Sequence, residues 1–156
     1  MATSLLHRLI VAPLPYVPQS VVWQLSRRYV AGTDLASACD TVVSLNALGC
    51  SATIDVLGEN STTRQEVDTA RDLYLAALNE LATRQLDCNA SIKLSDLGLR
   101  FDTALCYDVL ETIVAAAAEH NNFVRIDMED SSVTSSTLDI YRKLRETHSN
   151  AGTVIV

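Results

Sequence analysis

From residue 50 onward, apolar and polar positions along the chain follow a repeating pattern. Short, β-rich apolar runs that end on charged or polar groups alternate with longer stretches in which apolar residues recur at helical spacing. The short runs predict strands, and the longer stretches predict amphipathic helices. Three runs cover residues 52–59, 90–95 and 123–129, and a fourth begins at Thr153.

The helices between these runs have recognisable starts. Thr63 and Glu66 have the spacing of a capping box, and Asp102 is a typical N-cap residue. A further helix is expected from Ser135 to Glu146. Each strand-and-helix unit is about 35 residues long, which suits a strand, a loop, a helix and a return loop. The expected order is therefore β-α-β-α-β-α-β.

The residues before this repeat have helical periodicity and no strand alternation. One helix is expected between Pro18 and Gly32, and a second from Leu35 to Leu48, with Gly49 as its stop. We therefore expect two parts, an N-terminal helical segment over residues 1–49 and a barrel segment over residues 50–156.

Regular crossovers predict a parallel sheet, but both doubly wound sheets and (β/α)8 barrels contain a parallel sheet. Two observations favour the barrel. The first strand-helix turn contains a single glycine, Gly58, which argues against a dinucleotide site of the Rossmann type. Charged residues at the ends of successive strands favour a barrel, in which functional groups lie at the C-terminal ends of the strands.

The expected fold is α/β, with N-terminal helices followed by the first half, about four strands, of a (β/α)8 TIM-type barrel that is truncated. Half a barrel would expose two open sheet edges and an apolar inner face. Such a chain is expected to continue, to find a partner half, or to dimerise.

Composition narrows the class of protein. The chain has 156 residues, of which 48% are hydrophobic, and a net charge of −7 with a pI near 4.8. These values predict a globular chain and argue against nucleic acid as the main partner. No metal site is expected, because the cysteines form no CxxC pair and the histidines lie apart from them. Buried, reduced, inert thiols are expected instead, which indicates a cytoplasmic location; the cysteines are Cys39, Cys50, Cys88 and Cys106.

Lys93 is the first candidate for chemistry, because it stands in a predicted strand where an apolar residue is the default. Its charge needs an anionic neighbour there. Three roles are open: a structural ion pair with Glu59 or Asp127, a clamp for an anionic substrate, or a Schiff-base amine.

Carboxylates follow two of the predicted strands. Asp127 and Glu129 alternate with Met128, so in a strand the two carboxylates would face one side and Met128 the other. Hydrogen bonding to a cofactor ring or to Lys93 is favoured over metal binding, since no histidine stands at a strand end.

The first strand also ends on acidic residues. Asp55 lies deeper than Glu59 and is expected to position Lys93 or a backbone amide. Glu59 would either reach a positive group on a loop or later helix, or simply begin the exposed loop.

Taken together, the strand ends resemble proline dehydrogenase, the flavin-dependent enzyme of proline catabolism in its monofunctional bacterial form. The similarity runs over nearly the whole chain in order and spacing. The matching stretches are Arg27–Gly32, Asp55–Glu59, Ser91–Ser95 with Leu97–Gly98, and Asn122–Asp130.

The resemblance implies a distorted (β/α)8 barrel that holds FAD at the C-terminal ends of its strands. It implies hydride transfer from L-proline to the flavin, which gives 1-pyrroline-5-carboxylate, a quinone as electron acceptor, and it allows a peripheral contact of the full enzyme with the membrane. Lys93 resembles the lysine that binds the proline carboxylate, and Asp127 the catalytic aspartate that organises the pocket and Lys93. Met128 resembles the residue that contacts the flavin, and Glu59 the acid that pairs with a distant arginine to close the site.

The resemblance also implies groups that these 156 residues do not include, among them that arginine, a second arginine for the substrate carboxylate and the phosphate-binding segments of the C-terminal half of the barrel. The isolated chain is therefore expected not to oxidise proline. Two other functions remain open: a Schiff-base barrel lyase or aldolase that uses Lys93, and a non-catalytic remnant that only binds a partner.

Overall fold

The computed structural model describes residues 18, 31, 34–58 and 60–155. The chain divides into two compact units, Met1–Ala38 and Cys39–Val156, and almost all of the described residues belong to the second. The second unit begins inside the helix expected over residues 35–48, upstream of the boundary expected at residue 50. Apart from Pro18 and Ala31, the helix expected between Pro18 and Gly32 lies outside the described residues.

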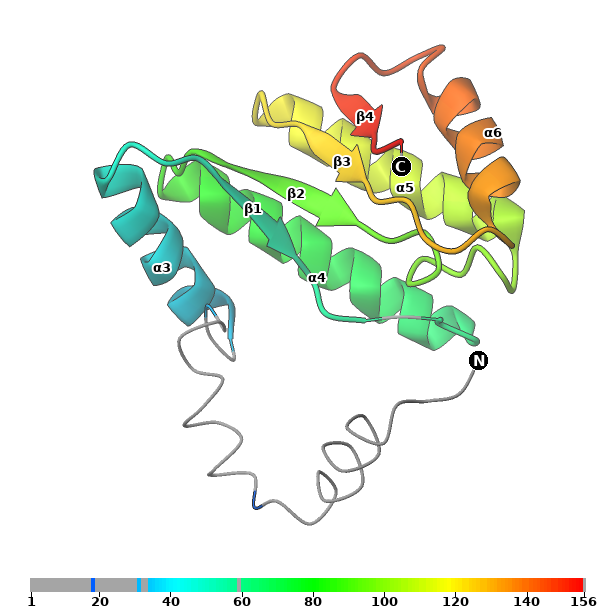
Figure 1. Cartoon of the computed structure of the whole chain (residues 1–156), viewed down its shortest axis with the longest axis horizontal. Coiled ribbons are helices and arrows are strands. Elements are labelled where there is room, and N and C mark those ends of the chain that lie inside the picture. The colour runs from blue at the N-terminus through cyan, green and yellow to red at the C-terminus, as the bar shows by residue number, and fades with distance from the viewer. Residues whose placement is uncertain (1–17, 19–30, 32–33, 59, 156) are drawn as a thin grey trace, which may run out of the picture. The chain divides into compact units, whose positions relative to one another are not determined.

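In the described part of the chain, strands and helices alternate in the expected order (Figure 1). None of these described helices is both long and apolar enough to cross a membrane. The elements are α3 (Leu35–Ala47), β1 (Ala52–Asp55), α4 (Arg64–Thr83), β2 (Cys88–Ile92), α5 (Thr103–Glu119), β3 (Val124–Ile126), α6 (Thr134–Leu144) and β4 (Ala151–Thr153).

The capping residues expected from the sequence are confirmed, whereas the helices expected to end at Leu48 and Glu146 end at Ala47 and Leu144. The Thr63 side chain accepts a hydrogen bond from the Glu66 backbone N–H, and the Glu66 carboxylate accepts one from the Thr63 backbone, which closes the capping box of α4. The Asp102 carboxylate accepts hydrogen bonds from two backbone N–H groups of α5, both at 3.0 Å. Helix α3 ends just before Gly49, whose φ of +77° is a conformation that glycine adopts without strain.

The four strands form one parallel sheet, in the order in which they occur in the sequence. A doubly wound sheet reverses its strand order at a switch point, whereas consecutive units of a barrel add strands in sequence. Right-handed crossovers then place the connecting helices on one face, and Figure 1 shows α4 and α5 behind the strands. The strand order thus decides the choice that the periodicity left open.

The helix-facing side of the sheet is the apolar core. Ile54, Ala90, Val124 and Ala151 lie in register across the four strands, and the last three are buried. The helices cover them with buried side chains that include Leu78, Leu110 and Leu144.

The opposite face of the sheet is polar, so the expectation of an apolar inner face is wrong. Side chains alternate along a strand, and the residues that follow the core positions form a second row in register: Asp55, Ser91, Arg125 and Gly152. Water or a polar ligand can satisfy these groups. Phe123, which is 41% exposed and whose ring lies against Gly152, adds apolar surface beside this row, so the face is mostly polar rather than apolar.

The strands are shorter than the runs that predict them. Strand β1 ends on Asp55, and Lys93 and Asp127 are the first residues after β2 and β3, so neither of the last two lies inside a strand as expected. The fourth strand was expected to begin at Thr153, but β4 ends there. Charged groups are hydrated more easily just beyond the sheet than within it, which explains why the ladder stops where they begin.

Three of the four cysteines are buried and all four are free. Burial raises the pKa of the Cys88 thiol to about 11 and that of Cys106 to about 12, so both remain protonated at neutral pH. The expectation of buried thiols is confirmed for Cys39, Cys88 and Cys106. It is wrong for Cys50, which is exposed in the connection between α3 and β1.

Candidate functional site

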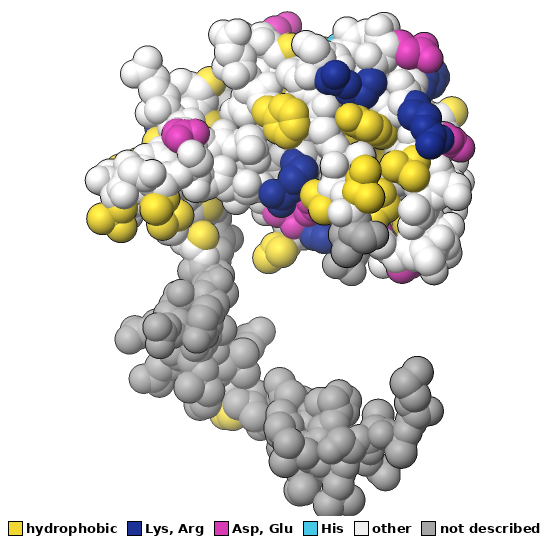
Figure 2. Space-filling model, turned by 45° about the horizontal axis from the view of Figure 1, so that its top comes forward, with side chains coloured by type: hydrophobic (Ala, Val, Ile, Leu, Met, Phe, Trp, Pro, Cys, Tyr) yellow, Lys and Arg dark blue, Asp and Glu magenta, His cyan; other side chains and the backbone are white. Residues whose placement is uncertain are grey.

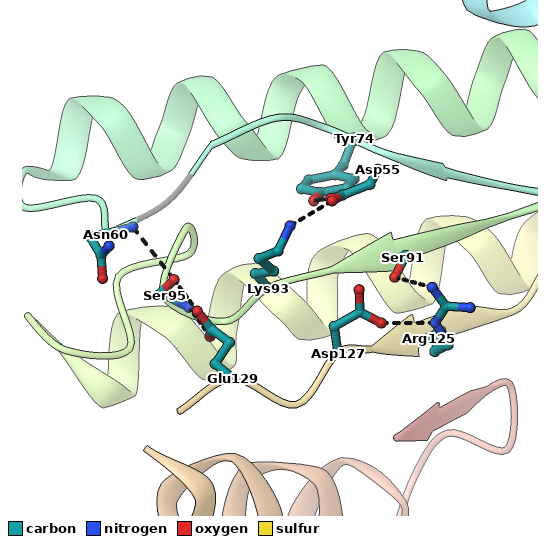
Figure 3. A network of polar contacts seen from close by, with 9 residues as sticks. All are labelled: Asp55, Asn60, Tyr74, Ser91, Lys93, Ser95, Arg125, Asp127 and Glu129. Atoms are coloured by element: carbon teal, nitrogen blue, oxygen red, sulfur yellow. Dashed lines mark hydrogen bonds and ion pairs between the residues drawn. The ribbon is translucent and has the colours of Figure 1, made fainter. Parts of the chain in front are cut away.

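Charged side chains from three neighbouring strands meet at one edge of the sheet. Asp55 ends β1, Lys93 follows β2 and Asp127 follows β3. Because the strands are parallel, all three positions lie at the C-terminal edge. Figure 3 shows two separate groups of contacts at this edge, one around Asp55 and Lys93 and one around Arg125 and Asp127.

Lys93 forms an ion pair with Asp55. Its Nζ lies 2.7 Å from Asp55 Oδ2, and the two side chains are 25% and 27% exposed. The other carboxylate oxygen, Oδ1, accepts a hydrogen bond of 3.1 Å from the hydroxyl of Tyr74, a fully buried residue of α4. The expected contact between Asp55 and Lys93 is thereby confirmed.

Asp127 contacts Arg125, which the sequence had not indicated as part of a site. Arg125 Nε donates a hydrogen bond of 2.8 Å to Asp127 Oδ1, and its Nη2 donates one of 2.9 Å to the hydroxyl of Ser91 on the neighbouring strand. The Arg125 and Asp127 side chains are 40% and 25% exposed. Arg125 therefore holds Asp127 at a fixed place beside the polar row.

Glu129 points away from Asp127 and toward Ser95 (Figure 3). Its Oε2 accepts a hydrogen bond of 2.9 Å from the Ser95 backbone N–H, and its Oε1 accepts one from the Ser95 hydroxyl. The expectation that Asp127 and Glu129 face one side is wrong, because both residues lie beyond β3 and strand alternation does not apply there. Glu129 instead ties the loop after β3 to the loop after β2.

Met128 lines a hollow of about 300 Å³ together with Leu138 and Ile155. This surface is largely apolar, and it lies at the same end of β3 as Asp127. Glu59, the remaining residue expected in the site, lies outside the described residues.

Asp96 is a further carboxylate near this edge, in the loop after β2. It is 5% exposed, its Oδ1 accepts a hydrogen bond of 3.3 Å from the Ser61 hydroxyl, and its Oδ2 has no partner among the described residues. Burial raises its pKa. Gly58 lies so close that an added Cβ would be 2.4 Å from Asp96 Oδ1, and both residues line a hollow of about 560 Å³.

Charged side chains of both signs are mixed on the face of the molecule that Figure 2 draws. On the face seen in Figure 2, Lys and Arg side chains lie directly beside Asp and Glu side chains, with hydrophobic side chains around them. The long-range field of such a face is weak.

The family comparison covers most of the chain. Residues 38–155 match the family described as Proline dehydrogenase. The chain belongs to the proline dehydrogenase family. Proline dehydrogenase 1 of Bacillus subtilis subsp. natto is 38% identical over 130 residues, which are 83% of this chain and 43% of that protein. Proline dehydrogenase 2 of Bacillus subtilis strain 168 is 30% identical over 82% of this chain and 42% of that protein. The chain spans less than half the length of these relatives.

A solved structure extends the agreement to the fold. Proline utilization A (PutA) from Bdellovibrio bacteriovorus, in a crystal structure of the protein inactivated by N-propargylglycine, matches with a TM-score of 0.73. The match has 20% sequence identity and covers 81% of this chain and 16% of that chain. Together with the sequential parallel sheet, it confirms the expected fold class, α/β units of a TIM-barrel fold.

Sequence reasoning missed three residues at this edge of the sheet. Tyr74 fits the apolar stripe of α4, and that pattern accounts for its ring but not for its hydroxyl. Arg125 lies in the stretch Asn122–Asp130 that resembles the family, and strand alternation places it on the same face as Ser91. Asp96 lies in a turn-like segment, and no local signal reveals its burial.

The contact between Gly58 and Asp96 predicts a stability effect of Gly58→Ala. A glycine-to-alanine change at a compatible backbone position usually stabilises a protein by about 0.4–1 kcal/mol. Here the added Cβ would meet the Asp96 carboxylate at 2.4 Å, so a loss of about 1–3 kcal/mol in the free energy of unfolding is expected instead. Denaturant titration measures it, and in an Asp96→Ala background the loss should largely disappear. An equal loss in both backgrounds would show that the contact is not the cause.

The buried Asp96 carboxyl also predicts a pH dependence of stability. Because burial raises its pKa in the folded state above the ordinary value of 3.8, the folded protein holds this proton more tightly than the unfolded chain. This contribution to the free energy of unfolding is complete below pH 3.8 and is lost as the pH rises through the folded pKa. Across that pH window, the free energy of unfolding of the Asp96→Asn variant should fall by less than that of the unaltered protein. Asp139→Asn, at an exposed position, is the control and should leave the fall unchanged.

Proposed function

We propose that the full-length protein oxidises L-proline to 1-pyrroline-5-carboxylate with FAD. The observation that carries this proposal is Lys93, a partly exposed lysine held by Asp55 at the C-terminal edge of a barrel-type sheet, in a chain of the proline dehydrogenase family. A lysine ammonium suits a carboxylate ligand as a point charge. Lys93 therefore binds the carboxylate of proline.

The other site residues have separate roles in this proposal. Asp127 is the active-site aspartate that organises the pocket, and Glu59 pairs with an arginine elsewhere in the full-length protein to close the site over the substrate. Both roles come from the family resemblance. The fixed position of Asp127 beside Arg125 supports the first of them.

The described residues fit one edge of a flavin. Met128, Leu138 and Ile155 line an apolar hollow next to the charged strand ends, and the edge of an isoalloxazine ring can pack on such a surface. When bound, FAD would supply the acceptor for the hydride that leaves C5 of proline, the ring carbon next to nitrogen that does not carry the carboxylate, while the nitrogen loses a proton. Lys93 orients proline for this step by fixing its carboxylate.

The proposal includes an electron acceptor and a location. A quinone as acceptor, with a peripheral membrane contact of the full enzyme, follows from the family alone. A cytoplasmic location is supported by the four free cysteines of the described chain, since thiols remain reduced in that compartment.

A proline-to-dye electron-transfer assay on the full-length protein tests the proposed function. Purified protein should carry flavin, reduce the dye only with proline present, and form the imine product. The 156-residue chain by itself should give no turnover, because it spans less than half the length of its relatives. Flavin-free full-length protein without proline-dependent turnover would contradict the proposal.

The structure disfavours the Schiff-base alternative. Imine formation needs a lysine amine that is free to attack a carbonyl carbon, whereas Nζ of Lys93 is engaged by the Asp55 carboxylate at 2.7 Å. Borohydride trapping of a carbonyl compound on Lys93 would reverse this conclusion.

A further inference from the structure

We propose that Tyr74 is a positioning residue for the substrate carboxylate: its hydroxyl holds Asp55, and Asp55 holds Lys93. This inference deepens the proposed function and rests on its assignment of Lys93 to the proline carboxylate. Tyr74 belongs to helix α4, whereas the groups it positions lie on the polar side of the sheet.

The contacts lead from the core to the site. The Tyr74 hydroxyl donates to Asp55 Oδ1 at 3.1 Å, and Asp55 Oδ2 faces Lys93 Nζ at 2.7 Å. Figure 3 shows the Tyr74 ring beside Asp55, with Lys93 reaching the same carboxylate from the neighbouring strand. Each oxygen of Asp55 thus has its own partner, which fixes the rotation of the carboxylate as well as its position.

The hydroxyl is not required for packing. The Tyr74 side chain is fully buried and belongs to the main hydrophobic cluster. A phenylalanine ring would fill the same space without a polar atom to satisfy. The hydroxyl therefore serves its polar neighbours, the Asp55 carboxylate and the backbone N–H of Val56.

The hydroxyl donates over the whole working pH range. Burial, and then the negative charge of Asp55, raise the pKa of Tyr74 well above its usual range. The other charged group that acts on it is Asp96, which raises the pKa further. Tyr74 thus stays protonated, and the hold on Asp55 does not vary with pH around neutrality.

A rigid Asp55 matters because Lys93 contacts two anions, the Asp55 carboxylate and the carboxylate of the substrate. If the carboxylate rotates freely, its second oxygen can turn toward the ammonium, and Lys93 is drawn away from the place where the substrate carboxylate arrives. With Oδ1 occupied by Tyr74, only Oδ2 engages Lys93. The ammonium of Lys93 is then held in one orientation relative to Asp55.

The test compares Tyr74→Phe with the unaltered full-length protein. Cyclopentanecarboxylate has the proline ring shape and the carboxylate but no amine, and cyclopentylmethanol lacks the charge. Calorimetry should show the carboxylate bound roughly 3- to 10-fold more weakly by Tyr74→Phe, with the affinity for the alcohol unchanged. The KM for proline should rise by the same factor, while kcat changes by less than about 2-fold.

Tyr107→Phe is the matched control. Tyr107 also donates its hydroxyl to a carboxylate, Glu111, at 3.3 Å, but it lies on α5 away from the site. This variant should bind cyclopentanecarboxylate as the unaltered protein does. A loss of equal size in both tyrosine variants would indicate a general effect on the fold and would overturn the proposal.

The outcomes separate this inference from the proposed function. If Tyr74→Phe weakens the carboxylate alone but the protein does not oxidise proline, the positioning role holds and the proposed reaction fails. If proline is oxidised and Tyr74→Phe binds the carboxylate with unchanged affinity, the positioning role is wrong. Failure of the unaltered protein to bind cyclopentanecarboxylate would also overturn it, because Lys93 would then not hold the anion.

Discussion

Replacing Lys93 with methionine in the full-length protein is expected to lower kcat/KM for proline by about 100-fold or more. The substitution weakens proline binding in two ways. It removes the ammonium that binds the substrate carboxylate, and it leaves the Asp55 carboxylate, 2.7 Å from Lys93 Nζ in the unaltered protein, without that counter-charge. Proline would then bring its own carboxylate toward an anion, which repels it. The loss should appear mainly in KM.

Two further variants make this measurement specific. The chain has a second lysine, Lys143, which lies on α6 over the ring of Tyr107, so Lys143→Met removes the same charge at an exposed surface. It should leave kcat/KM within about 2-fold of the unaltered value. Lys93→Arg keeps a cation and should retain part of the activity, whereas an imine mechanism would lose all of it. Unchanged KM for Lys93→Met would remove Lys93 from the substrate site.

The fold could be predicted from the sequence wherever short-range chemistry decides the structure. The Thr63 and Glu66 capping box and the Asp102 cap depend on residues only three positions apart, and each helix starts where they predict. Strand length was less predictable. A strand ends where the neighbouring strand no longer pairs with it. The residues of that neighbouring strand lie about 35 positions away in the sequence, so the apolar runs before Lys93 and Asp127 predicted strands that were too long.

The site was predictable as a set of strand ends but not as a set of contacts. Parallel strands bring Asp55 and Lys93 to one edge, which the sequence order alone requires. Which partner each charge selects depends on side chains from a helix and a neighbouring strand, here Tyr74 and Arg125. Helical spacing marks Tyr74 only as a core residue, because the pattern of apolar positions carries no information about the direction of a hydroxyl. The polarity of the inner face was missed for a related reason, since it is visible only once the strand register is known.

Replacing Asp127 with asparagine is expected to lower kcat/KM for proline by roughly 10- to 100-fold. The amide keeps the shape of the side chain but not the charge that holds Arg125 at 2.8 Å. Across the sheet, Arg125 is in register with Ser91, and Ser91 with Asp55, so Arg125 and Asp55 are about 10 Å apart at Cα. A released guanidinium can reach across that distance and compete with Lys93 for the Asp55 carboxylate. The substrate clamp would then lose its fixed position.

A double variant tests whether Asp127 acts through Arg125. If its role is to hold the guanidinium away from Asp55, then adding Arg125→Met to Asp127→Asn removes the competitor, and the double variant should be no less active than Asp127→Asn alone. Asp139→Asn, which breaks an exposed ion pair of 3.0 Å with Arg142, should leave the kinetics unchanged. If the losses of kcat/KM in the two single variants multiply in the double variant, the two residues act independently. Asp127 would then act on the substrate directly, and Arg125 would contribute separately to the same site.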